Sequence, residues 1–144
     1  MKHITSIRKA VCIIANRLHK EGYSLSVAFK RAWQTVKGHT FRAAGVTADN
    51  GQEKLSILRS FPLNDLQIGF RREPGNQYDS NAIQILVKVI SLNKYCCIGY
   101  VPHTMAVRMA AVMDQGVKIR GKALGVIGGY VNKENLGLLV SMAV

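Results

Sequence analysis

Residues 71–90 read RREPGNQYDSNAIQILVKVI and give the clearest fold signals in the chain. Pro74 and Gly75 are typical of a tight turn. After them, the apolar residues of segment 82–90 recur at every second position, which is the pattern of a strand with one buried face. Residues 66–71 predict an earlier strand, so this part of the chain is expected to form two strands joined by a turn-rich loop.

Two further strands are expected on either side of this pair. Residues 41–47 predict a first strand, and a turn signal follows at residues 49–51. Residues 95–101 predict a strand that pairs with residues 82–90 across a short turn, and Pro102 ends it. Four strands are therefore expected in the middle of the chain.

The C-terminal third combines one helix with two more strands. Thr104 predicts the cap of a helix that ends at Gly116, and its stripe of methionines indicates core packing. Residues 117–130 and 136–142 predict two strands around a turn at residues 132–135. The predicted fold class is α+β, mainly β, with a small closed or half-closed β-barrel and an inserted helix.

Two helices are expected before the barrel. The apolar residues of segment 4–18 recur in steps of three and four, which predicts an amphipathic helix. Ser24 or Ser26 can cap a second helix, which ends at Gly38. Its expected apolar face consists of Leu25, Phe29, Ala32, Trp33 and Val36. A helical hairpin packed on the barrel is favoured over a helix-turn-helix, whose recognition helix normally needs a third helix to support it. The expected domains are a basic helical hairpin, residues 1–39, and a barrel, residues 40–144.

Positive charge is concentrated in the N-terminal part of the chain. The 144 residues include 20 Lys or Arg and 8 Asp or Glu, so the net charge is +12. Residues 1–42 account for +8 of it, an asymmetry typical of a polyanionic partner. Nucleic acid and an anionic membrane are the two candidates, and the helices lack the large bulky face that membrane insertion favours. Nonspecific phosphate contacts are expected from Lys9, Arg17, Lys20, Lys30, Arg31 and Lys37.

Several function classes have no support in the sequence. No apolar run approaches the roughly 20 residues that span a bilayer, and residues 10–15 are too short for a secretory signal. The three cysteines and the scattered acids lack metal-ligand spacing, and a phosphate-loop lysine motif is absent. We therefore expect a cytoplasmic protein that is not an enzyme and that needs neither metal nor cofactor.

Two motifs give the chain a family resemblance. Residues 73–83 contain Glu-Pro, an Asn and then Tyr-Asp-x-Asn-Ala-Ile, and residues 98–102 read Ile-Gly-Tyr-Val-Pro. Ala106, Ala110 and Asp114 follow in the predicted helix. The order of these motifs resembles the signature of the HIRAN domain, and the resemblance covers roughly residues 40–143.

The resemblance implies a small six-stranded barrel related in shape to oligonucleotide-binding (OB) folds. HIRAN domains are attached to DNA-remodelling ATPases and also occur alone in bacteria and phages, so the expected location is a bacterial cell or a phage-infected host. In the fork-remodelling members the domain captures the 3′ end of single-stranded DNA. The match places Asn76, Tyr78 and Asp79 at positions that contact the terminal nucleotide, with Tyr78 stacking on a base and Asp79 facing the 3′-hydroxyl.

The chemistry of these residue types agrees with that implication. Phosphodiesters repel a carboxylate, but a free 3′-hydroxyl is a donor that Asp79 can accept. A tyrosine ring contributes about 1–3 kcal/mol of sequence-tolerant stacking. Candidates for holding the backbone phosphates are Arg42, Arg71 and Arg72, followed by His103 and Lys122.

Alternatives remain at these positions. Asn76, Asp79 and Asn81 are residues that often fix turns by bonding their own backbone, and Tyr78 could instead plug the barrel. The DNA-binding members carry aromatic residues after the arginine of the first strand, whereas Arg42 is followed here by two alanines. One stacking face is therefore missing unless Phe41, Tyr100 or Tyr130 replaces it.

Two classes of function are consistent with these observations. In the first, the barrel holds a single-stranded 3′ end or junction DNA while the basic helices grip neighbouring phosphates. In the second, the chain is a protein-interaction module of a phage or mobile element that inhibits a host nucleoprotein complex, which would be an anti-defence role.

Overall fold

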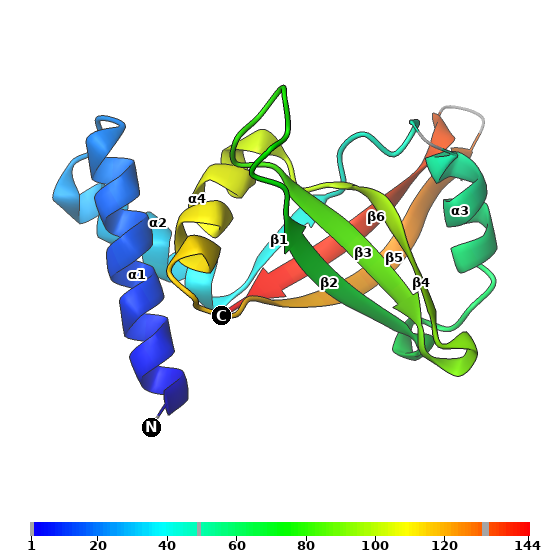
Figure 1. Ribbon diagram of the computed structural model, residues 1–144, viewed down its shortest axis with the longest axis horizontal. Coiled ribbons are helices and arrows are strands. Elements are labelled where there is room, and N and C mark those ends of the chain that lie inside the picture. The colour runs from blue at the N-terminus through cyan, green and yellow to red at the C-terminus, as the bar shows by residue number, and fades with distance from the viewer. Residues whose placement is uncertain (1, 49, 131–132) are drawn as a thin grey trace.

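The computed structural model describes residues 2–48, 50–130 and 133–144. Its six strands form one antiparallel sheet in the order β1-β6-β5-β2-β3-β4, and the sheet curls so that its two edge strands approach one another (Figure 1). The strands are β1 (His39–Arg42), β2 (Leu66–Arg72), β3 (Ile83–Val89), β4 (Lys94–Tyr100), β5 (Arg120–Tyr130) and β6 (Lys133–Ala143). The predicted α+β class and six-stranded barrel shape are confirmed.

One backbone bridge joins the two edges of this sheet. Just after β1, the Ala44 N–H donates to the Tyr100 carbonyl at 2.8 Å, and the Tyr100 N–H donates to the Ala44 carbonyl at 2.8 Å. The close approach is possible because Gly99 has no side chain: a Cβ atom there would lie 2.4 Å from the Ala44 oxygen. The barrel is therefore half-closed, with one bridge in place of a full strand pair.

The barrel core follows the alternation expected from the sequence. Ile83, Ile85 and Val87 of β3 are fully buried, and the residues between them are more exposed. Within this core lie Met105 and Met109 of α4 (His103–Asp114), so the predicted methionine stripe does pack inside.

The structure differs from the sequence prediction at several element boundaries. The first strand is His39–Arg42 and not residues 41–47: Ala44 already bridges to Tyr100 instead of β6, and Gly45 with φ 69° then turns the chain away. Pro102, and not Thr104, precedes the first residue of α4. A helix that the sequence analysis missed, α3 (Gly51–Leu58), covers one end of the barrel. The expected turns at residues 49–51 and 132–135 lie partly outside the described residues.

The N-terminal helices α1 (Lys2–Lys20) and α2 (Leu25–Lys37) form the expected hairpin, which packs against α4 (Figure 1). The Ser24 hydroxyl accepts the Val27 N–H at 3.3 Å and so caps α2. A second core joins the hairpin to the barrel. It contains Ala10, Val11, Ile14, Ala15, Leu18, Ala28, Ala32, Val36, Val112, Val117 and Val144.

The predicted buried face of α2 is partly wrong. Ala32 and Val36 are buried, but Leu25, Phe29 and Trp33 are more than one-third exposed. Small residues such as Ala28 occupy the interface instead, because closely packed helices leave little room for large side chains. No helix in the described part of the chain is long and apolar enough to cross a membrane.

Candidate nucleic-acid interface

The loop between β2 and β3 presents the predicted end-binding residues. The Asn76 side-chain oxygen accepts the N–H groups of Tyr78 at 2.9 Å and Asp79 at 3.1 Å. The Asp79 carboxylate accepts the Asn81 N–H at 2.9 Å. Asn76 therefore fixes the shape of the loop. Tyr78 is 89% exposed, which excludes the alternative that it plugs the barrel.

Arg72 fastens this loop to the C-terminal end of α4. Its guanidinium donates to both carboxylate oxygens of Asp114, at 2.9 and 3.2 Å. It also donates to the carbonyl oxygens of Ala82, at 2.9 Å, and Ser80, at 3.1 Å. The side chain is only 16% exposed. Arg72, which the sequence analysis placed among the phosphate contacts, thus has a position that orders the loop.

A second attachment lies at the other end of α4. His103 Nδ1 and Asp79 Oδ2 are 2.9 Å apart. The hydrogen bond from His103, followed by that from the Asn81 N–H, lowers the pKa of Asp79. The carboxylate is therefore ionised at neutral pH, and each of its oxygens retains a lone pair for another donor. The His103 ring is 71% exposed beside it.

The lowered pKa gives the stability of the loop a predictable pH dependence. Wild type should have a higher melting temperature than Asp79→Asn above about pH 4, the usual pKa of aspartic acid. The pKa of Asp79 in the folded protein is lower than this usual value. The difference in melting temperature should therefore shrink below about pH 4 and disappear as the pH falls through the folded-state pKa. Thermal unfolding of both proteins between pH 7 and pH 2 measures this change. Parallel melting curves over the whole range would contradict it.

Arg71 and Tyr100 belong to a side-chain network on the adjoining strands. Arg71 Nε donates to Gln84 at 2.7 Å, and Gln84 donates to Glu73 at 3.2 Å. The Tyr100 hydroxyl donates to the same Glu73 oxygen at 2.8 Å, which raises the pKa of Tyr100. Arg71 remains exposed with its terminal guanidinium nitrogens unbonded among the described residues, whereas the Tyr100 ring is half-buried.

The two remaining predicted cations lie on β1 and β5, strands that do not flank the loop. Arg42 of β1 packs over Gly137, and Lys122 of β5 is exposed opposite Ser141. Across the described ranges, no hydrogen bond or ion pair joins either cation to the loop. Phe41 is buried with its ring 6.2 Å from that of Phe70, so it does not replace the missing stacking face. The Tyr130 side chain lies outside the described residues.

The basic residues of the hairpin divide into two groups. Arg17 pairs with Glu21 at 3.6 Å, Lys9 donates to the Gln115 carbonyl at 3.2 Å, and Lys20 lies in the same region between α1 and α4. Lys30 and Arg31 instead face a hollow between α2 and α4, whereas Lys37 is exposed near the end of α2.

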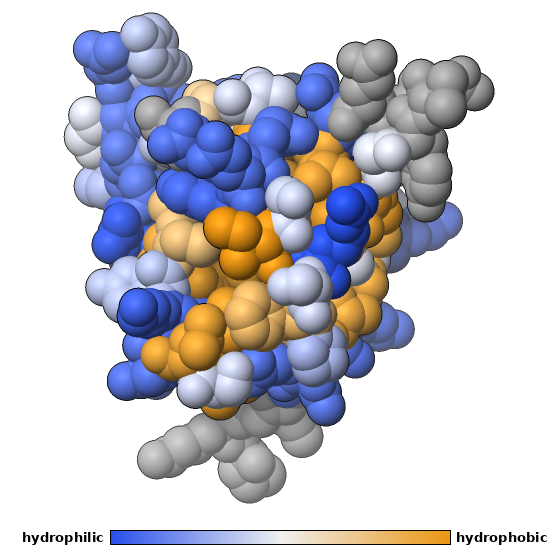
Figure 2. Space-filling model, turned by 90° about the vertical axis from the view of Figure 1, so that its right-hand side faces the viewer, coloured by the Kyte–Doolittle hydropathy of each residue, from blue (hydrophilic) through white to orange (hydrophobic). Residues whose placement is uncertain are grey.

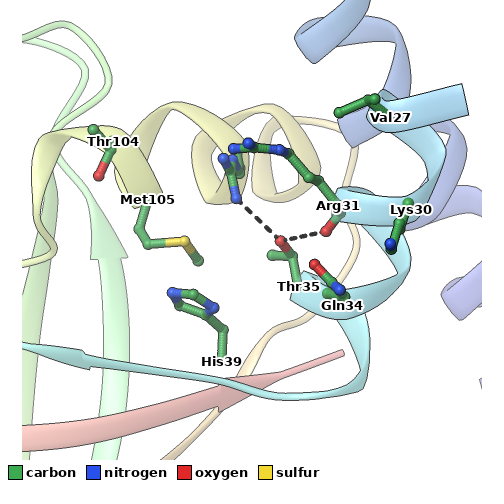
Figure 3. A pocket seen from close by; sticks show the side chains of 9 residues that line it. Val27, Lys30, Arg31, Gln34, Thr35, His39, Thr104 and Met105 are labelled. Atoms are coloured by element: carbon green, nitrogen blue, oxygen red, sulfur yellow. Dashed lines mark hydrogen bonds between the residues drawn. The ribbon is translucent and has the colours of Figure 1, made fainter. Parts of the chain in front are cut away.

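We call this hollow the α2/α4 groove, and its volume is about 600 Å³. Figure 3 shows side chains of α2 on one side of it, Thr104 and Met105 of α4 on the other, and His39 at the start of β1. Its lining residues are Val27, Lys30, Arg31, Gln34, Thr35, His39, Thr104, Met105 and Arg108. Sequence analysis missed Arg108 and His39 because they belong to separate segments that only the packing of the hairpin brings together.

A half-closed barrel with an exposed tyrosine and adjacent cations carries the residue types with which barrels of this kind bind nucleic acid. The model of the HIRAN domain matches residues 64–136, just over half of the chain, and the chain belongs to the HIRAN domain family. Membership of this family indicates a DNA-binding domain.

Comparison with solved structures supports the fold. A crystal structure of a protein from Lactobacillus plantarum resembles this chain with a TM-score of 0.51 and 25% identity. The match covers 74% of this chain and 93% of the other. No curated protein matches the chain.

Proposed function

We propose that this protein holds the 3′ end of a DNA single strand, free or at a fork or junction, against Tyr78 and Asp79. The observation that supports this proposal most directly is the placement of Tyr78. Its ring is 89% exposed on a loop that hydrogen bonds attach to both ends of α4, through Arg72 and Asp79. An exposed aromatic on an ordered loop can stack on a base without first paying the entropy of ordering that loop.

The neighbouring groups suggest how the terminal nucleotide is recognised. Asp79 accepts the 3′-hydroxyl through a lone pair that its protein donors leave free. His103 hydrogen-bonds to this carboxylate, and its exposed ring can contact the same ligand. Arg71 contacts a phosphate with its terminal nitrogens, while Arg72 acts as a positioning residue.

The hairpin of residues 1–39 supplies the nonspecific part of the interaction. Most of its lysines and arginines are exposed, and it contributes much of the net charge of +12. If about six duplex phosphates are neutralised, the logarithm of the binding constant falls with log salt at a slope near −5. Such a slope would identify phosphate contacts as the main source of duplex affinity.

Fluorescence anisotropy with labelled strands tests end recognition. Strands that end in a 3′-hydroxyl should bind wild type about tenfold more tightly than strands that end in a 3′-phosphate, because a charge-assisted hydrogen bond is lost and a repulsive charge is added. Asp79→Ala should remove this preference. The affinity for blunt duplex, measured at two salt concentrations, gives the contribution of nonspecific phosphate contacts.

The matched control is Glu53→Ala, which removes an exposed acid from α3. It should keep the preference for a 3′-hydroxyl. Equal affinity of wild type for all ends, unchanged by Asp79→Ala, would overturn end capture and leave only nonspecific electrostatics.

A second candidate function rests on an apolar patch at the opposite end of the barrel. Figure 2, which faces this end, shows hydrophobic residues gathered over its centre. The exposed apolar members of this patch around one hollow are Ile57, Leu92 and Tyr95. Lys54 and Lys94 border a hollow within the patch, so an acidic protein with apolar side chains is the complementary partner. Absence of DNA binding near physiological salt would favour this protein-interaction role, including inhibition of a host nucleoprotein complex.

A further inference from the structure

The α2/α4 groove adjoins the end of α4 that contacts the loop, because Thr104 lines it and the preceding His103 contacts Asp79. We propose that it binds backbone phosphates of the same DNA strand whose 3′ end lies at Tyr78 and Asp79. This inference rests on the proposed function. In it, residues of the hairpin contact particular phosphates of the bound DNA strand, whereas the proposed function gives the hairpin only nonspecific phosphate contacts.

Positive charge without an acidic partner is the first observation that supports the groove. Lys30, Arg31 and Arg108 line it, and its lining contains no acidic residue. Of its three cations, Arg31 also makes a cation–π contact, with its guanidinium carbon 4.8 Å from the centroid of the Tyr23 ring. The ion pairs found in the described part of the chain involve Arg17, Arg72 and His103, and none of these lies in the groove. Like charges that converge in a hollow repel one another, so an anion placed between them is stabilised by all three.

Thr35 at the floor of the groove holds Arg108 in place. Its side chain is buried, and its hydroxyl donates to the Arg31 carbonyl at 2.9 Å. The same oxygen accepts Arg108 Nη1 at 3.4 Å (Figure 3). A guanidinium has five N–H donors, and this contact uses one of them. Arg108 is thus held with donors left for the paired oxygens of a phosphate, which its planar fork fits.

Helix α4 places the groove next to the end site. His103, the first residue of α4, contacts Asp79, and the adjacent Thr104 lines the groove. Arg108 follows Thr104 by four residues and therefore lies on the same face of the helix. Five residues separate His103 from Arg108, which corresponds to a rise of about 7.5 Å along α4. A strand that ends at the loop can continue into the groove.

The groove depends on the hairpin as well as on the barrel. Lys30, Arg31 and His39 come from the segment before residues 64–136, which match the family model, whereas Arg108 lies within them. The site exists because the hairpin packs on the rest of the chain, α1 against α4 and α2 against β6, with Ala32, Val36 and Val112 in one core. The packing of the hairpin therefore creates a phosphate site that neither part forms alone.

A strand-length series tests the groove separately from the end site. Anisotropy would compare strands of about 4 and about 16 nucleotides that end in a 3′-hydroxyl, for wild type and the double variant Lys30→Gln, Arg108→Gln. The long strand should lose about tenfold in affinity and the short one little. The salt slope on the long strand should become shallower by about 1.4, because each single-strand phosphate contact contributes about 0.7. The preference for a 3′-hydroxyl should remain.

The matched control is Lys118→Gln, an exposed cation after the C-terminal end of α4. It should leave the long-strand affinity close to that of wild type. Arg108 is partly buried, so Arg108→Gln could unfold the protein; in that case Lys30→Gln, which changes an exposed side chain, is tested alone. On its own it should lose part of the long-strand affinity and about 0.7 of the slope.

The outcomes separate the two proposals. If wild type prefers a 3′-hydroxyl but the groove variants bind long strands as tightly as Lys118→Gln, the groove proposal fails and end capture stands. If wild type has no end preference and long strands still depend on Lys30 and Arg108, end capture fails and the groove remains a phosphate site. An equal loss on blunt duplex would overturn the assignment to the captured strand.

Discussion

Gly99→Ala should lower the free energy of unfolding by about 3 kcal/mol. The added Cβ would lie 2.4 Å from the Ala44 oxygen and 3.2 Å from Val46 Cγ1. The Ala44 oxygen accepts the Tyr100 N–H in the bridge that joins the two edges of the barrel. Because the clash is with a backbone atom, no side-chain rotation can relieve it, and the bridge must open. Urea unfolding followed by circular dichroism measures the loss.

Gly125→Ala is the control for this substitution. Gly125 also lies in the sheet, but a Cβ atom there would have no neighbour within 4 Å, and its φ is not in the left-handed region. This variant should differ from wild type by no more than a few tenths of a kcal/mol, since alanine also restricts the unfolded chain. Similar midpoints for the two variants would show that the Ala44–Tyr100 bridge contributes little to stability.

The sequence predicted the elements whose signals are local. The strand Ile83–Val89 was correctly predicted, because alternation along one strand determines which residues are buried. Helix α3 was missed because it has only eight residues and is held by Leu55 and Leu58, which pack on strands far away in the sequence. The face of α2 was misjudged because hydrophobicity indicates that a face is buried, but not that its partner helix admits only small side chains.

The candidate site was predictable to a smaller extent. Tyr78 and Asp79 were singled out from a contiguous motif, and their exposure and contacts are consistent with that prediction. The partners of the loop were not predictable, since Asp114 lies 42 residues from Arg72 and His103 lies 24 residues from Asp79. Contacts between residues so far apart in the sequence depend on where the strands place the loop against α4. They can be predicted only when the order of the strands in the sheet is known.

Arg72→Met should lower the free energy of unfolding by about 2 kcal/mol and should also weaken the preference for a 3′-hydroxyl. Methionine keeps most of the apolar stem but removes the donors to Asp114 and to two loop carbonyls. Asp114 is half-exposed, so solvent screens its share, and most of the loss comes from the two carbonyl contacts. Urea unfolding, limited proteolysis of residues 73–82 and the anisotropy ratio for the two strand ends measure the three effects.

Arg71→Met distinguishes loss of loop order from loss of charge. It removes the same charge from the neighbouring position, but Arg71 is exposed and, among the described residues, its side chain hydrogen-bonds to Gln84 alone. Arg71→Met should therefore weaken binding to all DNA ends alike and leave proteolysis of the loop unchanged. Arg72→Met should instead speed cleavage of the loop and reduce the discrimination between ends. If the two variants behaved alike, Arg72 would act through its charge, and the attachment of the loop to α4 would not be what positions Tyr78 and Asp79.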